Sequence, residues 1–166
     1  MAGMKWGKSK CPMAMGQGLG SRLLAAPRIK GGIGADEGYW QALERGGFAI
    51  SRCAGCKTWM WPAHFRCGHC GSWDIIWEEV APEGTVYTYT RNHAVSDVIA
   101  ERRVQLPFVT LLVELPQAGG ARVAGVLQGS DAGLRIGARV RGHIRPADAI
   151  SKDYTTMVWE LVGDAA

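Results

Sequence analysis

Two pairs of cysteines constrain the fold of this chain more than any other feature. Cys53 and Cys56 form one Cys-x-x-Cys pair, and Cys67 and Cys70 form another after ten intervening residues. Four thiolates match the number and the softness of the ligands that a tetrahedral zinc ion takes, with zinc–sulfur bonds of about 2.3 Å. The spacing therefore predicts a structural zinc ribbon. Because cysteine fills all four positions, none is left for a catalytic water.

Two other interpretations of the cysteines fit the sequence less well. A redox dithiol of the thioredoxin type uses one Cys-x-x-Cys near a βαβ pattern, and paired disulfides are typical of small secreted chains. The sequence has neither context. His64 and His69 are close enough along the chain to replace a sulfur, but with four cysteines present we expect them to be solvated or to lie beside the ligands.

Glycines lie in and next to the cysteine pairs. Gly55 and Gly68 are inside the pairs, and Gly71 follows the second one. Glycine adopts a positive φ without the steric cost of a Cβ atom, so we expect these three residues to ease the tight turns around the metal. Arg52 and Arg66 precede the two pairs and are expected to lie beside the negative charge of the zinc–thiolate centre.

The net charge of +4 is unevenly distributed over the 166 residues. Residues 1–35 contain six lysines and arginines and no acid, whereas residues 81–166 contain nine basic and nine acidic residues. The segment 1–35 is rich in glycine and lacks a helical or alternating apolar period, which predicts a flexible or partner-wrapping arm. We expect a helix and the zinc ribbon over residues 36–80 and a strand-rich domain over residues 81–166.

The sequence favours a cytoplasmic protein without a membrane anchor. No apolar run approaches the roughly 20 residues of a membrane-spanning helix, and no basic-then-apolar leader of the secretory type is present. Cys11 is left over as a fifth cysteine. An unpaired thiol and a thiolate metal site both suit a reducing compartment.

A short helix is expected before the zinc ribbon, over residues 36–45. Asp36 is the expected N-cap, and Tyr39, Trp40 and Leu43 form an apolar stripe at helical spacing. Gly46 would end the helix.

The second half of the chain predicts five strands. They are rich in β-branched and aromatic residues and cover residues 84–90, 108–115, 121–128, 138–145 and 155–162. A helical turn is expected over residues 130–134, between the third and fourth strands. This is the element order of an OB-fold barrel. The predicted fold is therefore mainly β, with an N-terminal helix and a rubredoxin-like zinc ribbon followed by a five-stranded OB-fold barrel.

Several stretches carry a family resemblance. They are Tyr39-Trp-Gln-Ala-Leu43, the two cysteine pairs with Cys70-Gly-Ser72, Gly84-Thr-Val-Tyr-Thr-Tyr89, Pro107-Phe-Val-Thr-Leu-Leu-Val-Glu-Leu115 and Leu134-Arg-Ile-Gly-Ala-Arg-Val140. Together they resemble the DUF35 family, whose members combine a zinc ribbon with an OB fold, over about residues 38 to 162.

The resemblance implies a function that the residues alone do not. It implies a non-catalytic subunit of a thiolase-like complex that acts on acyl-CoA thioesters by thiolysis, acyl transfer or retro-aldol cleavage. A thiolase-fold enzyme would be the partner in a hetero-oligomer, and the coenzyme A thioester would be a shared ligand. This chain would help to form the channel for CoA and substrate, and its zinc would be structural.

The long connection over residues 91–106 contains the arginines that we expect to contact CoA. Connections of this length tend to be functional. Arg91, Arg102 and Arg103 are candidates for the phosphates, because a guanidinium group binds phosphate oxygens through two parallel hydrogen bonds. The alternative is that these arginines are ordinary solvated charges.

Two other functions remain open. A single-stranded nucleic-acid-binding OB-fold module needs a positive groove and exposed aromatic rings. The barrel region carries no net charge, and we expect Tyr87 and Tyr89 to be half-buried strand residues, so nucleic acid is an unlikely ligand. A stand-alone acyl-CoA-binding protein is the other alternative. His93 and Asp97 lack a recognisable nucleophile nearby, so we assign no catalytic residue.

Overall fold

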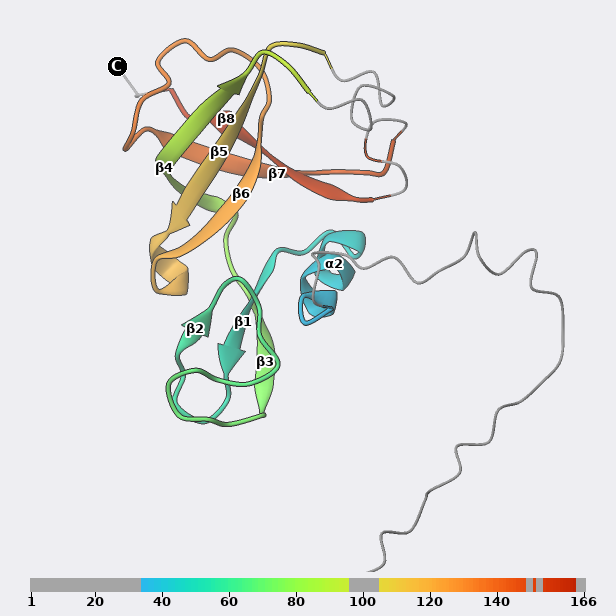
Figure 1. Cartoon of the computed structure of the whole chain (residues 1–166), viewed down its shortest axis with the longest axis vertical. Coiled ribbons are helices and arrows are strands. Elements are labelled where there is room, and N and C mark those ends of the chain that lie inside the picture. The colour runs from blue at the N-terminus through green and yellow to red at the C-terminus, as the bar shows by residue number, and fades with distance from the viewer. Residues whose placement is uncertain (1–33, 96–104, 149–150, 152–153, 164–166) are drawn as a thin grey trace, which may run out of the picture.

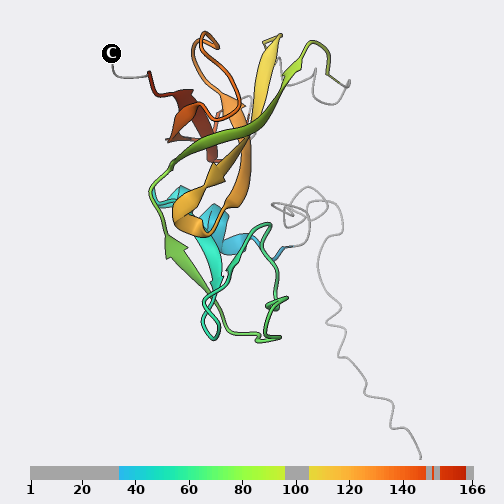
Figure 2. The same ribbon diagram turned by 90° about the vertical axis from the view of Figure 1, so that its left-hand side faces the viewer.

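The computed structural model describes residues 34–95, 105–148, 151 and 154–163. These residues form a short helix, a small sheet and a closed barrel. The small sheet lies below the barrel, and the helix lies beside the junction between them (Figure 1). The view turned by 90° shows the same stacking (Figure 2).

Helix α2 (Glu37–Glu44) turns its apolar side into the protein, where Tyr39, Ala42 and Leu43 are buried. It ends as expected, because Gly46 adopts a φ of +81° and its N–H donates to the Leu43 carbonyl at 3.0 Å. Asp36 occupies the expected N-cap position, but its side chain makes no capping hydrogen bond. Its Oδ2 accepts the indole N–H of Trp40 at 2.8 Å.

The small sheet has three antiparallel strands in the order β2-β1-β3. They are β1 (Ala49–Cys53), β2 (Trp59–Met60) and β3 (Ile75–Glu79). The buried hydroxyl of Ser51 in the central strand donates to the carbonyl of Met60 in β2. This bond helps to hold the loop that carries the first cysteine pair against the sheet.

Five strands close the barrel in the order β4-β5-β6-β8-β7. They are β4 (Glu83–Asn92), β5 (Phe108–Leu115), β6 (Ala121–Leu127), β7 (Arg139–Arg145) and β8 (Thr156–Leu161). Strands β6 and β8 pair in parallel, whereas the other neighbouring strands pair antiparallel. This arrangement confirms the predicted five-stranded OB-fold barrel.

The barrel core follows from alternation along its strands. In β5, Val109, Leu111, Val113 and Leu115 are buried and the residues between them are half-buried. The core also includes side chains from outside the barrel, because Tyr39, Leu43, Phe48 and Ile50 belong to the same buried cluster. The ring of Phe48 packs edge-on against Trp159 at 6.1 Å. The helix and the start of β1 are thus anchored to the barrel.

The helical turn expected over residues 130–134 is wrong. The connection between β6 and β7 instead makes two tight turns, at Ala132–Gly133 and Ile136–Gly137. Gly133 and Gly137 adopt φ values of +85° and +84°, which a right-handed helix cannot accommodate. The short 3₁₀ helix η2 (Pro116–Ala118) lies between β5 and β6.

Candidate metal centre and barrel cavity

The four predicted metal ligands come together in the structure. The sulfur atoms of Cys53, Cys56, Cys67 and Cys70 lie within 4.8 Å of one another. Two of the distances, Cys53 to Cys70 and Cys56 to Cys67, are 3.6 Å. A tetrahedral zinc site with bonds of about 2.3 Å separates its sulfurs by about 3.8 Å, whereas a disulfide joins them at about 2 Å. The sulfurs are therefore spaced for a shared metal ion and not for disulfides.

Both cysteine pairs fold into the same kind of turn. The N–H of Lys57 donates to the Cys53 carbonyl, and the N–H of Gly71 donates to the Cys67 carbonyl, each at 3.0 Å. Lys57 and Gly71 both adopt a positive φ, of +64° and +75°. The turns thus place their left-handed residue directly after the second cysteine of each pair.

This position corrects the expectation for the glycines. Gly71 has the expected positive φ, but Gly55 and Gly68 do not. The two-residue interior of each turn needs no left-handed residue. In the first turn, a lysine occupies the left-handed position that glycine occupies in the second.

Hydrogen bonds and neighbouring thiols shift the pKa values of the cysteines in opposite directions. Hydrogen bonds from Thr58, first through its hydroxyl and then through its backbone, lower the pKa of the Cys56 thiol to about 5. For Cys70, the backbone N–H of Ser72 lowers the pKa, but the Cys56 and Cys53 thiols outweigh it and raise the pKa to about 11. Four thiolates therefore cannot ionise together without a compensating charge, which a zinc ion would supply. The donor set fits that metal.

An arginine supports each metal-binding turn. Arg52 Nε donates to the Lys57 carbonyl and Arg66 Nε donates to the Gly71 carbonyl, each at 2.8 Å. Each guanidinium also lies over a tryptophan ring, at 4.8 Å from Trp59 for Arg52 and 5.6 Å from Trp73 for Arg66.

Sequence reasoning placed both arginines near the metal for their charge and missed their role as donors to the turns. The repeated pattern Arg-Cys-x-x-Cys was the available signal. The two histidines are exposed. A side-chain hydrogen bond from His69 helps to lower the pKa of Cys56, which places His69 beside the ligands as expected.

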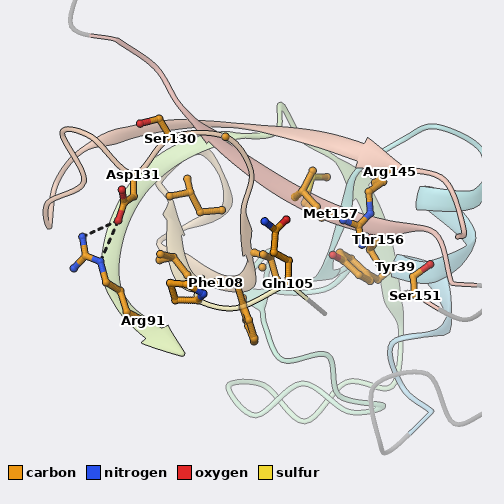
Figure 3. A pocket seen from close by; sticks show the side chains of 18 of the residues that line it. Tyr39, Arg91, Gln105, Phe108, Ser130, Asp131, Arg145, Ser151, Thr156 and Met157 are labelled. Carbon is orange, nitrogen blue, oxygen red and sulfur yellow. Dashed lines mark hydrogen bonds and ion pairs between the residues drawn. The ribbon is translucent and has the colours of Figure 1, made fainter. Parts of the chain in front are cut away.

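A cavity of about 850 Å³ opens on one side of the barrel, beside α2. Its walls come mainly from β5, β6 and β8, and their apolar side chains include Phe108, Val126, Leu127, Met157 and Val158. Figure 3 shows two polar groups of residues on opposite sides of this apolar surface. One consists of Arg91, Ser130 and Asp131, and the other of Tyr39, Arg145, Ser151 and Thr156, with Gln105 between them.

Of the three arginines predicted to contact CoA, Arg91 is placed by the structure. It lines the cavity and its Nε and Nη2 atoms each lie 3.1 Å from Asp131 Oδ2. This hydrogen bond is the main reason why the pKa of Arg91 is raised. Arg102 and Arg103 lie outside the described residues, as do residues 1–33 of the expected arm. The contact with CoA stays a prediction.

The two tyrosines of β4 differ in exposure. Tyr89 is half-buried against the core, as expected, whereas Tyr87 is 43% exposed. The pairing of β4 with β5 shifts between Val86 and Thr88, so Tyr87 is the extra residue of a bulge and points outward. The guanidinium of Arg122 covers its ring at 3.6 Å.

Among the described residues, no helix is long and apolar enough to cross a membrane.

Comparisons with known proteins agree with this architecture. A model of the ChsH2 rubredoxin-like zinc ribbon domain matches residues 40–74, and a model of the ChsH2 C-terminal OB-fold domain matches residues 77–145. A solved structure named Ltp2-ChsH2(DUF35) aldolase contains a chain that is 30% identical, with a TM-score of 0.68, and the match covers 82% of this chain and 98% of that one.

A second solved structure supports the fold alone. It is a DUF35 protein of unknown function from Sulfolobus solfataricus, 19% identical with a TM-score of 0.51, and the match covers 77% of this chain and 85% of that one. No curated protein sequence matches the chain.

Proposed function

Because this chain belongs to the DUF35 family of zinc-ribbon and OB-fold proteins, we propose that it is a non-catalytic subunit of a thiolase-like complex that acts on acyl-CoA thioesters. The observation that carries the proposal is the 30% identity over 98% of the DUF35 chain in an aldolase assembly. Among thiolysis, acyl transfer and retro-aldol cleavage, that neighbour favours the aldol-type reaction. The partner supplies the reacting groups, and this chain completes the channel for CoA and substrate.

The partner's docking surface is proposed to lie at the metal-binding end of the molecule. Trp73 is 71% exposed and Phe65 is 59% exposed. Ile76, which follows Trp73 closely in the sequence, is also exposed. Exposed aromatic residues of this kind often carry much of the energy of a protein interface. Arg66 holds the Trp73 ring from one side, so the ring is ordered before binding. Tyr39 and Leu43 of α2, by contrast, are already buried within the chain.

Zinc would serve this interface by fixing its shape. Phe65 and Trp73 lie just outside the second cysteine pair, and Arg66 links that turn to Trp73 through its bond to the Gly71 carbonyl. Loss of the metal would release the turn and with it the exposed aromatic residues. The metal is thus proposed to act on binding and not on the chemical step.

The arginine pairing disfavours the nucleic-acid alternative. Within the described residues, five arginines pair with carboxylates: Arg52 with Glu78, Arg91 with Asp131, Arg122 with Glu114, Arg141 with Glu83 and Arg145 with Asp148. A groove that binds a phosphate backbone would need uncompensated positive charge.

Co-purification tests the proposal. The tagged chain is purified from its own host in low-salt buffer and the bound proteins are identified by mass spectrometry. We expect a stoichiometric thiolase-fold enzyme, and we expect Trp73→Ala to reduce its recovery at least tenfold. Tyr87→Ala is the matched control, because Tyr87 is an exposed aromatic residue on the barrel. Recovery of the chain alone, or with nucleic acid that dissociates as salt rises, would overturn the proposal.

The proposed contact with CoA phosphates needs its own experiment. Arg91, Arg102 and Arg103 are replaced together by glutamine in the reconstituted complex. The Michaelis constant for acyl-CoA should rise, while the recovery of the partner should stay the same. An unchanged Michaelis constant would show that these arginines do not bind the phosphates.

A further inference from the structure

The barrel cavity has an apolar wall that the described side chains leave partly open. The cavity measures about 850 Å³, and α2 forms one end of it through Tyr39 and Trp40. On the barrel side, Val126 is 38% exposed and Phe108 is half-buried. Figure 3 shows Phe108, Met157 and Tyr39 around the same space. An open apolar surface of this kind is typical of a site that another molecule or another segment covers.

Asp36, next to the α2 end of the cavity, is a buried carboxylate with only one oxygen paired. Its side chain belongs to a residue that is 7% exposed. Oδ2 accepts the indole N–H of Trp40, which lines the cavity, whereas Oδ1 is buried and has no hydrogen-bond partner among the described residues. Buried carboxylates are usually paired with donors, and a cation is the best donor for a charged oxygen. This end of the cavity therefore lacks a cationic donor.

The N-terminal arm, residues 1–33, joins the described structure at this same place. Gly34 adopts a φ of +73° and a turn follows it before α2 begins, so the chain changes direction where the arm ends. Only a few residues separate the arm from Tyr39 and Trp40 in the cavity wall. Fully extended, residues 19–33 would span about 50 Å. The arm is therefore long enough to fold back across the whole cavity.

The composition of the arm matches both features of the cavity. The arm contains six lysines and arginines and no acid, so it can supply the cation that Asp36 lacks. Its second half is also rich in apolar side chains, which have no other surface to cover among the described residues: Leu19, Leu23, Leu24, Ile29 and Ile33. The family model of the zinc ribbon begins at residue 40, so membership of the family does not account for the arm.

We propose that residues 19–33 fold back at Gly34 and lie in the barrel cavity, with Arg28 paired to the carboxylate of Asp36. The apolar side chains of the segment pack on β5, β6 and β8, which form most of the cavity wall. Arg28 is the arginine nearest to Asp36 in the arm, and a guanidinium group pairs with a carboxylate better than an ammonium group does. The docking uses this chain alone, so it goes beyond the proposed function and does not rest on it.

Photo-crosslinking in the full zinc-loaded chain tests where the arm lies. Leu24 is replaced by p-benzoylphenylalanine, the isolated chain is irradiated, and the crosslinked peptides are identified by mass spectrometry. We expect crosslinks to residues of β5, β6 or β8 that line the cavity, and far fewer from the same probe at Met4, outside the docking segment. A mixture of ¹⁵N-labelled and unlabelled chains shows whether each crosslink joins one chain or two. Crosslinks to other surfaces, crosslinks between two chains, or none at all would overturn the proposal.

The ion pair is tested in the chain that carries the probe at Leu24. Asp36→Asn should lower the yield of cavity crosslinks about twofold or more, because it removes the charge that Arg28 would meet. Asparagine is as good an N-cap as aspartate, so the variant should fold. Glu37→Gln is the matched control, since Glu37 is the next residue of the chain and is exposed. Equal losses in Asp36→Asn and Glu37→Gln would show that Asp36 does not anchor the arm.

A variant of the barrel tests the cavity independently of the ion pair. Ala124 lines the cavity and is exposed, so Ala124→Phe should occupy the space and greatly reduce the cavity crosslinks without loss of fold. Thr88→Phe is the control, because Thr88 is exposed on β4 and is absent from the cavity lining. An unchanged yield in Ala124→Phe would show that the arm does not lie in the cavity. Because the isolated chain is used, none of these results depends on the co-purification experiment.

Discussion

The metal-binding end and the barrel of this protein are stabilised by different interactions. At the metal-binding end, the buried cluster consists of Cys53, Met60 and Cys67, with Cys56 and Ile75 packed against it. The main cluster contains sixteen buried residues, with the fully buried Trp159 among them. Three buried residues are too few for a hydrophobic core, so we expect a chelated metal ion to take its place. The barrel needs no such support.

The boundary between the two regions runs along β1. Ile50, near the start of the strand, belongs to the barrel cluster, whereas Cys53, at its end, is one of the four clustered cysteines. The chain itself passes from the small sheet to the barrel between β3 and β4, where Gln117 Nε2 donates to the carbonyls of Ala81 and Glu83 at 2.7 and 2.8 Å. Strand β1 therefore connects the four cysteines directly to the core of the barrel.

Removal of zinc should have the largest effect and should separate the two regions. Structural zinc contributes on the order of 10 kcal/mol of apparent folding free energy in small zinc domains. We expect a strong chelator, or Cys67→Ser, to abolish hydrogen-exchange protection in the parts of β1–β3 next to the four cysteines while β5 and β6 remain protected. The partner should also dissociate. Cys11→Ser is the control, because Cys11 lies outside the two Cys-x-x-Cys pairs of the sequence. Loss of protection in the barrel would mean that the regions are not independent.

Truncation of the main core should have the reverse effect. Trp159 is fully buried, and replacement of such a residue by alanine costs about 3–5 kcal/mol. Trp159→Ala should therefore lower the urea midpoint of the barrel while the bound zinc, measured with a colorimetric chelator after denaturation, stays at one ion per chain. Trp73→Ala should change the urea midpoint little, since its ring is exposed. Zinc loss in Trp159→Ala would contradict the proposed separation.

The features that the sequence predicted are those that short-range patterns encode. The cysteine spacing predicted which four sulfur atoms lie together, and the alternation of Val109, Leu111, Val113 and Leu115 specified the buried face of β5. The error at residues 130–134 has a local cause as well. Ser130 and Asp131 are common helix-starting residues, but Gly133 and Gly137 adopt left-handed conformations and end any helix there.

The features that the sequence did not predict depend on pairing between distant segments. Asp131 is forty residues from Arg91, so their ion pair could not be read from spacing. The cavity likewise depends on the register that places Arg145 opposite Thr156. The bulge that exposes Tyr87 needs the partner strand to be known. A pattern read along one strand contains no information about its neighbour.

A smaller effect should be seen at alkaline pH, where Tyr39 joins α2 to the barrel core. Burial, with a contribution from the charge of Asp36, raises the pKa of Tyr39. A raised pKa in the folded state means that the unfolded chain releases the tyrosine proton first, so stability is lost as pH rises above about 10. The loss is about 1.4 kcal/mol at about pH 11. In urea unfolding at this pH, Tyr39→Phe should lose less folding free energy than the wild-type protein by about this amount, whereas Tyr87→Phe should lose as much as the wild-type protein. Equal losses in the wild-type protein and Tyr39→Phe would show that the tyrosine is not responsible.

The smallest predicted effect compares the two metal-binding turns with each other. Gly71→Ala places a side chain at a φ of +75° and should cost roughly 1–2 kcal/mol. The added Cβ also lies 3.0 Å from Arg66 Nη2, a flexible group that can move. Lys57→Gly should change stability by less than about 0.5 kcal/mol, because relief of the left-handed strain is offset by the entropy that glycine gains in the unfolded chain.

Competition with a chelator measures these differences as changes in apparent zinc affinity. Gly68→Ala is the matched control, since Gly68 has no positive φ and nothing lies within 4 Å of an added Cβ. An equal loss of apparent zinc affinity in Gly71→Ala and Gly68→Ala would mean that the positive φ of Gly71 is not the cause of the loss. A large gain in apparent zinc affinity in Lys57→Gly would mean that the backbone of the first turn is more strained than that of the second. The bond from Arg52 to the Lys57 carbonyl would then be one of the contacts that holds the lysine in that conformation.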